Sequence, residues 1–211
     1  MVNKKITSID DLSVKDINLI SNQAIKFKNS KKNQIAKNPK NIFNLFLEPS
    51  TRTTVSFELA AKKLGHNSIN INFDKSSLSK GETFRDTMNT LISMKPDALI
   101  IRDKTNFSPQ NISKDLKIPV INAGDGTNEH PTQALLDFCV IKSIYKNKKI
   151  SIGLCGDIKH SRVAHSNIKL FTKLGYKLHL IAPSYFIDKT EVNKINPNVT
   201  FHKNLKRIND I

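Results

Sequence analysis

Four consecutive hydrogen-bond donors, Ser50, Thr51, Arg52 and Thr53, follow a short apolar segment that ends at Pro49. The residues after them have the pattern of a helix. The first turn of a helix offers free backbone N–H groups and the positive end of the helix dipole, which suit an anion. Arginine adds a planar fork that matches two phosphate oxygens. We therefore predict a phosphate site here; the alternative is an ordinary Ser/Thr N-cap beside a surface arginine.

A second segment with chemical potential runs from Asn122 to Gln133 and follows the apolar residues Val120 and Ile121. Its glycines permit a tight loop at the carboxyl end of a strand, where ligands bind in parallel sheets. Pro131 presets the first turn of the next helix. His130 and Gln133 then lie one turn apart and can face the same side. The imidazole of His130 can donate to a carbonyl oxygen of a ligand, and the side-chain amide of Gln133 can bind an amide group of a ligand. The alternative is that His130 only caps the helix.

Three further cations could add to an anion site, two of them at the carboxyl ends of predicted strands and one, Lys80, in a loop outside the strand-end crevice. Lys80 precedes a predicted helix, Arg102 closes a predicted strand, and Arg162 opens a helix and could bind a carboxylate with two hydrogen bonds. Each has a simpler interpretation, as a mobile loop lysine, a solvated strand end or a charged first helical turn. These signals gain weight only as additional anion-binding groups beside Ser50.

The elements that position these residues alternate between apolar strand-like runs and helix-length amphipathic runs. Such alternation predicts a parallel, doubly wound α/β sheet, followed by a second sheet that begins near Ile150. The first helix, capped by Ser13, should bury Val14, Ile17, Ile20 and Ile25. The strands are expected at residues 42–47, 68–72, 98–101, 119–121, 149–155 and 176–181, and the helices at 13–28, 52–64, 82–94, 108–115, 131–145 and 162–174.

The formal net charge of the 211 residues is +16. A basic chain can bind nucleic acid, but its lysines are scattered rather than gathered in one stripe, so we expect a field that attracts small anions instead. No apolar run is long enough to span a membrane, and no secretory signal follows Met1. Cys139 and Cys155 lie in apolar surroundings and are expected to be reduced core thiols of a cytoplasmic protein.

Three blocks together resemble the catalytic chain of the aspartate carbamoyltransferase family, within the aspartate/ornithine carbamoyltransferase superfamily. Order and spacing agree from the first predicted helix to at least Pro183. Ornithine-using relatives share the first block, but they typically carry Cys where this chain has Thr132 and lack a lysine at Lys80. The blocks are Ser50-Thr51-Arg52-Thr53, Lys80-Gly81-Glu82 and His130-Pro131-Thr132-Gln133.

The resemblance implies transfer of a carbamoyl group from carbamoyl phosphate to L-aspartate, a step of pyrimidine biosynthesis, by positioning and preorganised donors. It calls for no metal, cofactor or covalent intermediate. Thr53, Arg102 and His130 would polarise the carbamoyl oxygen, Gln133 would hold the carbamoyl NH₂, and Arg162 with Lys80 would bind aspartate. The implied carbamoyl phosphate-binding residues are Ser50, Thr51, Arg52, Thr53, Ser76, Lys80, Arg102, His130 and Gln133.

In the family, Lys80 and a preceding serine, Ser76 or alternatively Ser77, reach into the site of a neighbouring subunit. The resemblance therefore implies a homotrimer with shared sites, to which regulatory chains could bind, and it implies no nucleic-acid or membrane partner. One departure is Thr54, where family members commonly have Arg; that position serves packing or subunit contacts.

The larger departure is length, because family chains are about half as long again. We expect residues 1–133 to bind carbamoyl phosphate, 134–148 to link, and 149–211 to form part of an aspartate-binding domain. Its apolar faces should stay partly uncovered at Ile152, Leu154, Leu178, Leu180 and Ile181. The alternative function is a non-catalytic remnant that binds carbamoyl phosphate or serves as a structural subunit.

Overall fold

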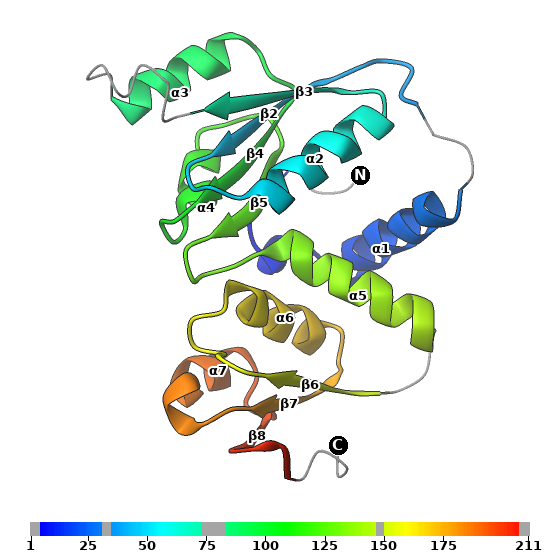
Figure 1. Ribbon diagram of the computed structural model, residues 1–211, viewed down its shortest axis with the longest axis vertical. Coiled ribbons are helices and arrows are strands. Elements are labelled where there is room, and N and C mark those ends of the chain that lie inside the picture. The colour runs from blue at the N-terminus through cyan, green and yellow to red at the C-terminus, as the bar shows by residue number, and fades with distance from the viewer. Residues whose placement is uncertain (1–4, 31–34, 73–82, 147–149, 207–211) are drawn as a thin grey trace.

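The computed structural model describes residues 5–30, 35–72, 83–146 and 150–206. It contains two parallel sheets, one of five strands and one of three. Helix α5 (Pro131–Tyr145) follows the last strand of the first sheet and leads toward the first strand of the second (Figure 1). The chain is therefore a doubly wound α/β unit joined to a smaller α/β unit, as the alternating pattern predicts.

The five-stranded sheet has the order β1-β5-β4-β2-β3, and all neighbouring strands are parallel. The order reverses beside β2, which creates the kind of crevice where open α/β sheets bind ligands. The strands are β1 (Lys5–Ile6), β2 (Asn41–Phe46), β3 (Asn67–Asn72), β4 (Ala98–Asp103) and β5 (Val120–Asp125), and the α-helices before α5 are α1 (Val14–Asn29), α2 (Thr51–Lys63), α3 (Phe84–Ser93) and α4 (Ser108–Ser113).

The second sheet has the order β6-β7-β8, again with parallel neighbours. Its strands are β6 (Ser151–Cys155), β7 (Lys177–Ile181) and β8 (Thr200–His202), with α6 (Arg162–Lys173) between the first two and α7 (Lys189–Ile195) between the last two. Short 3-10 helices lie at Ile9–Asp11 (η1) and Ser184–Phe186 (η4).

Local sequence signals account for the ends of the helices. Ser13 caps α1 in a capping box with Asp16, which satisfies free N–H groups of the first turn. Helix α2 is followed by Gly65, whose φ of +77° is the left-handed conformation that glycine adopts most easily. Helix α3 begins at Phe84 with Thr83 as its cap, two residues later than the pattern predicts.

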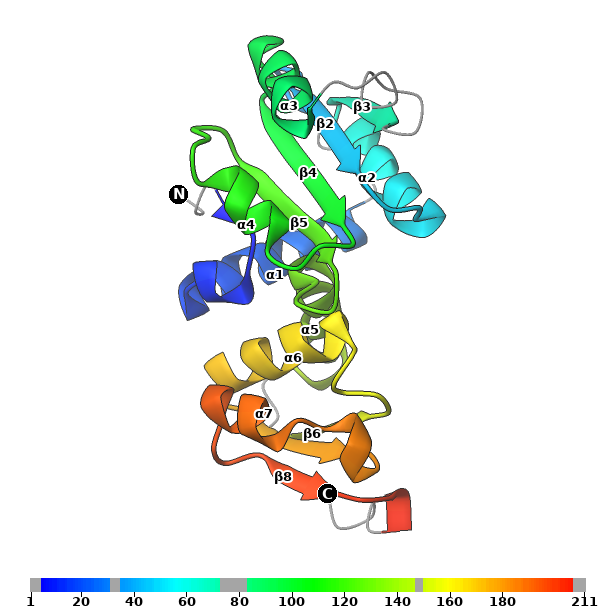
Figure 2. The same cartoon turned by 90° about the vertical axis from the view of Figure 1, so that its left-hand side faces the viewer.

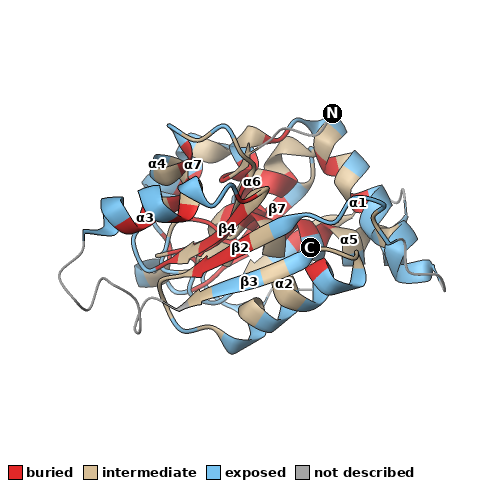
Figure 3. Ribbon diagram, turned by 90° about the horizontal axis from the view of Figure 1, so that it is seen from above, coloured by how far each residue is buried: buried red, intermediate tan, exposed pale blue. Residues whose placement is uncertain are grey.

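Two groups of buried side chains form the interior, and both lie against the strands (Figure 3). One lies between β2, β4, β5 and α3, around Phe43, Leu99 and Met88. The other includes Ile9 of η1, Phe138 of α5, and Phe171 of α6. The second group therefore joins the N-terminal turn and the connecting helix to the three-stranded sheet.

Several details of the predicted packing are wrong. Val14 is 45% exposed, because the inward side of α1 is centred on Ile17. Ile152, Leu178, Leu180 and Ile181 are buried, and Leu154 is half-buried, because α6 and α7 supply apolar partners.

Two local assignments also differ. Cys155 is exposed and Cys139 half-buried, so Cys155 is not a core thiol. Residues 122–125 belong to β5 rather than to a loop, and β4 continues through Asp103, so that Arg102 lies within the strand. No helix in the described part of the chain is long and apolar enough to cross a membrane.

Candidate active site

The carboxyl ends of β2, β4 and β5 converge on one edge of the larger sheet, and α2, α5 and α6 begin close to that edge (Figure 2). Ser50 occupies the N-cap position of α2, but within the described residues its side chain makes no cap hydrogen bond. Its hydroxyl instead donates to Thr53 Oγ1 over 2.9 Å. Backbone N–H groups of the first turn thus remain available to an anion.

Arg102 lies at the centre of this edge with a side chain only 12% exposed. Its Nη1 donates to Thr53 Oγ1 and to the Ala123 carbonyl oxygen, both over 3.2 Å. Its Nε lies 2.7 Å from Glu48 Oε1 without being directed at it, so this contact is an ion pair rather than an aligned hydrogen bond. Burial and the nearby Arg162 lower the pKa of Arg102, which indicates a site with excess positive charge.

Arg162 begins α6 and reaches the same place from the second sheet. Its Nη2 donates to Glu48 Oε1 over 2.8 Å, so one carboxylate oxygen bridges both arginines. Its Nη1 is buried and has no hydrogen-bond partner among the described residues. A buried guanidinium N–H without a partner costs free energy, and an anion in the site would satisfy it.

Gly124 of β5 lies between the two arginines. A Cβ atom built at this position would stand 3.2 Å from Arg102 Nη1 and 3.2 Å from Arg162 Cζ. Its φ of +114° is a conformation that residues with side chains rarely adopt. The absence of a side chain here lets the guanidinium groups from the two sheets approach one backbone position.

His130 precedes the first turn of α5. Burial, followed by the positive charges of Arg102 and Arg162, lowers the pKa of His130 to about 4. The ring is therefore neutral near pH 7. Its Nδ1 lies 3.3 Å from Thr132 Oγ1, and its backbone N–H donates to Ser166 Oγ over 2.8 Å. The histidine is at the N-cap position, but its side chain makes no cap hydrogen bond within the described residues.

The other predicted residues are exposed, bonded within their own helices, or outside the described residues. Thr51 and Arg52 are exposed on the first turn of α2. Gln133 lies in the first turn of α5, where its Nε2 donates to Asp137 Oδ1 over 3.0 Å. Thr54 donates to the Ser50 carbonyl oxygen over 2.8 Å, a local role. Ser76, Ser77 and Lys80 lie outside the described residues.

Sequence reasoning missed Glu48 and the role of Gly124. Glu48 lies two residues after the end of β2 and directly precedes Pro49, so a charged residue near a strand end was the available signal. That signal was weak because a carboxylate is not expected among anion-binding groups. Its role as the ion-pair partner of Arg102 and Arg162 is visible only in the folded structure.

Comparison with known proteins identifies the family of the chain. Residues 4–143 match the family model described as aspartate/ornithine carbamoyltransferase, carbamoyl-P binding domain. The matched segment contains the complete larger sheet and the first turn of α5. The chain belongs to the aspartate/ornithine carbamoyltransferase family. Within this family, curated relatives are named as aspartate carbamoyltransferase catalytic subunits.

The relative from Pelagibacter ubique is 44% identical over 98% of this chain, and that from Wolbachia of Culex pipiens is 43% identical over 93%. This chain covers 67% and 68% of their lengths, respectively. Solved structures of aspartate transcarbamoylase from Trypanosoma cruzi also match this member of the carbamoyltransferase family. One contains aspartate and phosphate, with a TM-score of 0.83, 31% identity, and coverage of 96% of this chain and 70% of that one. Another contains N-(phosphonacetyl)-L-aspartic acid, with a TM-score of 0.84 and 31% identity over 96% of this chain and 69% of that one.

Proposed function

We propose that the chain contributes to the transfer of a carbamoyl group from carbamoyl phosphate to L-aspartate, giving N-carbamoyl-L-aspartate and phosphate. The observation that carries the proposal is the meeting of Arg102, Arg162 and Thr53 beside a neutral His130, with Gly124 between the arginines. Cations, a hydroxyl and an uncharged imidazole suit a phosphorylated substrate with a polarised carbonyl group.

The donor half of the proposed site binds carbamoyl phosphate. The phosphate sits at the start of α2, where backbone N–H groups, Ser50, Thr51, Arg52 and Thr53 surround it. A helix of 13 residues presents its positive dipole end to the phosphate. Ser76 and Lys80 of a neighbouring subunit complete this half; that part of the proposal rests on the resemblance to the family.

The carbamoyl group extends from the phosphate toward β4 and α5. Thr53, Arg102 and His130 direct donors at the carbamoyl oxygen, and Gln133 binds the NH₂ group. The lowered pKa keeps His130 neutral, and a neutral imidazole still has one ring N–H to donate. When the neutral amine of aspartate attacks the carbamoyl carbon, the bond to the phosphate oxygen breaks and phosphate leaves with that electron pair, and the proton lost by the nitrogen goes with the departing phosphate. Charge develops on the carbamoyl oxygen, where preorganised donors contribute most.

The acceptor half contains Arg162, joined in the proposal by Lys80. Arg162 pairs with Glu48 in the structure. In the proposed reaction, a carboxylate of the substrate aspartate takes the place of the Glu48 carboxylate. In the proposed organisation, residues 1–133 bind carbamoyl phosphate, 134–148 link, and 149–211 form part of the aspartate-binding domain. The described acceptor side offers one arginine, whereas aspartate carries two carboxylates.

The proposed assembly is a homotrimer in which each site draws residues from two subunits. Regulatory chains are possible further partners. The cytoplasm is the proposed location, where the free thiols of Cys139 and Cys155 would remain reduced.

The proposal is tested by incubating the purified chain with carbamoyl phosphate and aspartate and measuring carbamoyl-aspartate and phosphate together. Equal amounts of the two products support transfer. Phosphate release without carbamoyl-aspartate, beyond the spontaneous rate, would contradict it. Saturable carbamoyl phosphate binding with neither product would favour the non-catalytic remnant instead.

A further inference from the structure

A buried carboxylate beside the site is not used by the proposed chemistry. Glu129 directly precedes His130 and is only 1% exposed. It accepts hydrogen bonds from Ser8 Oγ over 2.5 Å and from the backbone N–H of Ile9 over 3.0 Å. It also accepts from Ser166 Oγ over 3.2 Å and from Lys169 Nζ over 2.8 Å. Both oxygens are therefore engaged by two segments far from Glu129 in sequence, η1 and α6.

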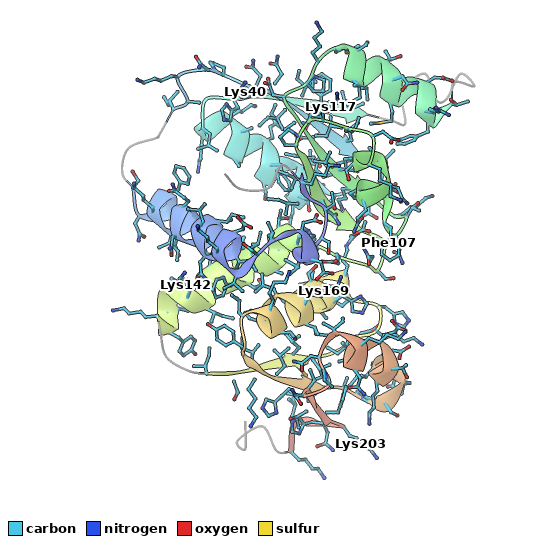
Figure 4. All side chains as sticks on the ribbon, turned by 180° about the vertical axis from the view of Figure 1, so that it is seen from behind. Lys40, Phe107, Lys117, Lys142, Lys169 and Lys203 are labelled. Carbon is cyan, nitrogen blue, oxygen red and sulfur yellow. The ribbon has the colours of Figure 1, made fainter. Side chains whose placement is uncertain are left out.

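Lys169 supplies the counter-charge that makes this burial tolerable. It lies where η1 and α6 meet (Figure 4), and its Nζ also binds Asp10 Oδ2 over 2.6 Å. Burial alone would lower the pKa of Lys169, but Glu129 and Asp10 outweigh that effect and raise it. The ammonium is thus charged near pH 7, and the buried carboxylate has a paired charge.

The contacts of Glu129 connect two residues of the site, His130 at the start of α5 and Arg162 at the start of α6. Ser166 accepts a hydrogen bond from the His130 backbone N–H over 2.8 Å and donates to Glu129. Ser166 lies four residues after Arg162, about one turn further along α6. A continuous set of bonds therefore joins His130, through Ser166 and Glu129, to the helix that begins with Arg162.

We propose that Glu129, held by Lys169, is a positioning residue that sets Arg162 relative to His130 and thereby aligns the acceptor half of the site with the donor half. This inference rests on the proposed function. Neither Glu129 nor Lys169 touches the substrates. The effect of losing the pair should fall on ligands that span both halves, because placement errors are felt most where two groups must act together.

The test compares two ligands by calorimetry: carbamoyl phosphate, which occupies the donor half, and N-(phosphonacetyl)-L-aspartate, which spans both halves. The variants are Glu129→Gln, Lys169→Met, and both together. Lys173→Met is the matched control, because Lys173 is also on α6 and binds carbonyl oxygens of Ile9 and Leu12 without touching Glu129. Circular dichroism and thermal unfolding verify that each variant is folded.

We expect Glu129→Gln and Lys169→Met to weaken binding of the spanning ligand by about tenfold or more and to change the affinity for carbamoyl phosphate by no more than about threefold. The ratio of the two affinities should therefore change by at least about threefold, or about 0.7 kcal/mol. The double variant, which buries no unpaired charge, should recover part of the loss. Lys173→Met should lower stability and leave the ratio of the two affinities unchanged.

Equal losses for both ligands, or an unchanged ratio in the folded single variants, would overturn the positioning role while leaving the proposed function intact. The same follows if Lys173→Met shifts the ratio as much as Lys169→Met does. If the single variants do not fold, the double variant decides. Weaker binding of N-(phosphonacetyl)-L-aspartate by the double variant, with unchanged binding of carbamoyl phosphate, supports the role. Failure of the unaltered chain to bind either ligand would overturn the proposed function and this inference with it.

Discussion

Substitution of Gly124 by alanine tests the arrangement of the two arginines with a single methyl group. The new Cβ would stand 3.2 Å from Arg102 Nη1 and 3.2 Å from Arg162 Cζ, closer than carbon atoms normally pack. Arg102 cannot retreat freely because Thr53, the Ala123 carbonyl and Glu48 hold it. Both guanidinium groups must therefore move by a few tenths of an ångström or lose one of these contacts.

Two effects of the change have separate magnitudes. The backbone strain of alanine at φ +114° should cost about 1–3 kcal/mol of folding free energy. This loss corresponds to roughly 2–4 °C of melting temperature per kcal/mol in a chain of this size. Displacement of Arg102 should cost one charge-assisted hydrogen bond to carbamoyl phosphate, about 1.5–3 kcal/mol, or roughly a 10- to 100-fold weaker affinity for that ligand.

Gly156→Ala is the matched control, because Gly156 has a similar φ of +122° but nothing within 4 Å of its added Cβ. Thermal unfolding should show similar destabilisation in both variants. Calorimetry with carbamoyl phosphate should show the affinity loss in Gly124→Ala alone. An unchanged affinity in folded Gly124→Ala, or equal losses in the two variants, would refute the placement of Arg102 against bound carbamoyl phosphate.

Three other predictions address single groups. Arg52→Ala should weaken carbamoyl phosphate binding by roughly 2–5 kcal/mol, since a charge-assisted pair is lost; unchanged calorimetric affinity would remove Arg52 from the site. His130 takes up a proton near pH 6.5 when unfolded but only near pH 4 when folded, so its contribution to stability is complete above pH 6.5 and is lost as the pH falls toward 4. His130→Gln should therefore reduce the change in the free energy of unfolding between these pH values by at most about 3 kcal/mol. Denaturant titrations that show the same pH dependence of this free energy in the variant and the wild type would contradict the prediction. Mixed trimers of Arg52→Ala and Lys80→Ala chains should regain phosphate binding at sites with both native residues; no recovery in trimers verified as mixed would exclude a shared site.

The order and type of most elements could be predicted because periodicity and caps are local signals. Ser13, Gly65 and Pro131 stand where α1 begins, α2 ends and α5 begins. Strand β1 and helix α7 escaped the prediction. Strand β1 has only two residues and forms because Lys5 and Ile6 pair with Val120 and Ile121, a partner more than a hundred residues away.

Exposure was harder to predict than secondary structure, because it depends on which elements pack together. The apolar residues of β6 and β7 were expected to stay uncovered, but α6 and α7 bury most of them. We predict that the 211-residue chain alone has little or no transferase activity, because the described acceptor side offers one arginine, Arg162, to a substrate with two carboxylates.

The donor half of the proposed site rests on the Ser50 block, where a strand end, a proline and four donors form a local sequence signal. Glu48 could not be placed in the same way. Its role follows from Arg102 on β4 and Arg162 on α6, which meet its carboxylate only after both sheets have formed. The role of the buried Glu129 also could not be predicted from local sequence, since its partners come from the N-terminal turn and α6.

The most direct test of the donor site is a phosphorus NMR titration of carbamoyl phosphate with the unaltered chain, with aspartate absent. We predict a saturable change in the shift or width of the phosphate resonance, reversed by inorganic phosphate and absent with the Arg52→Ala chain. A resonance that stays unchanged at protein concentrations equal to those of the ligand, or an equal response with the Arg52→Ala chain, would contradict the assignment of the α2 N-terminus as the phosphate site.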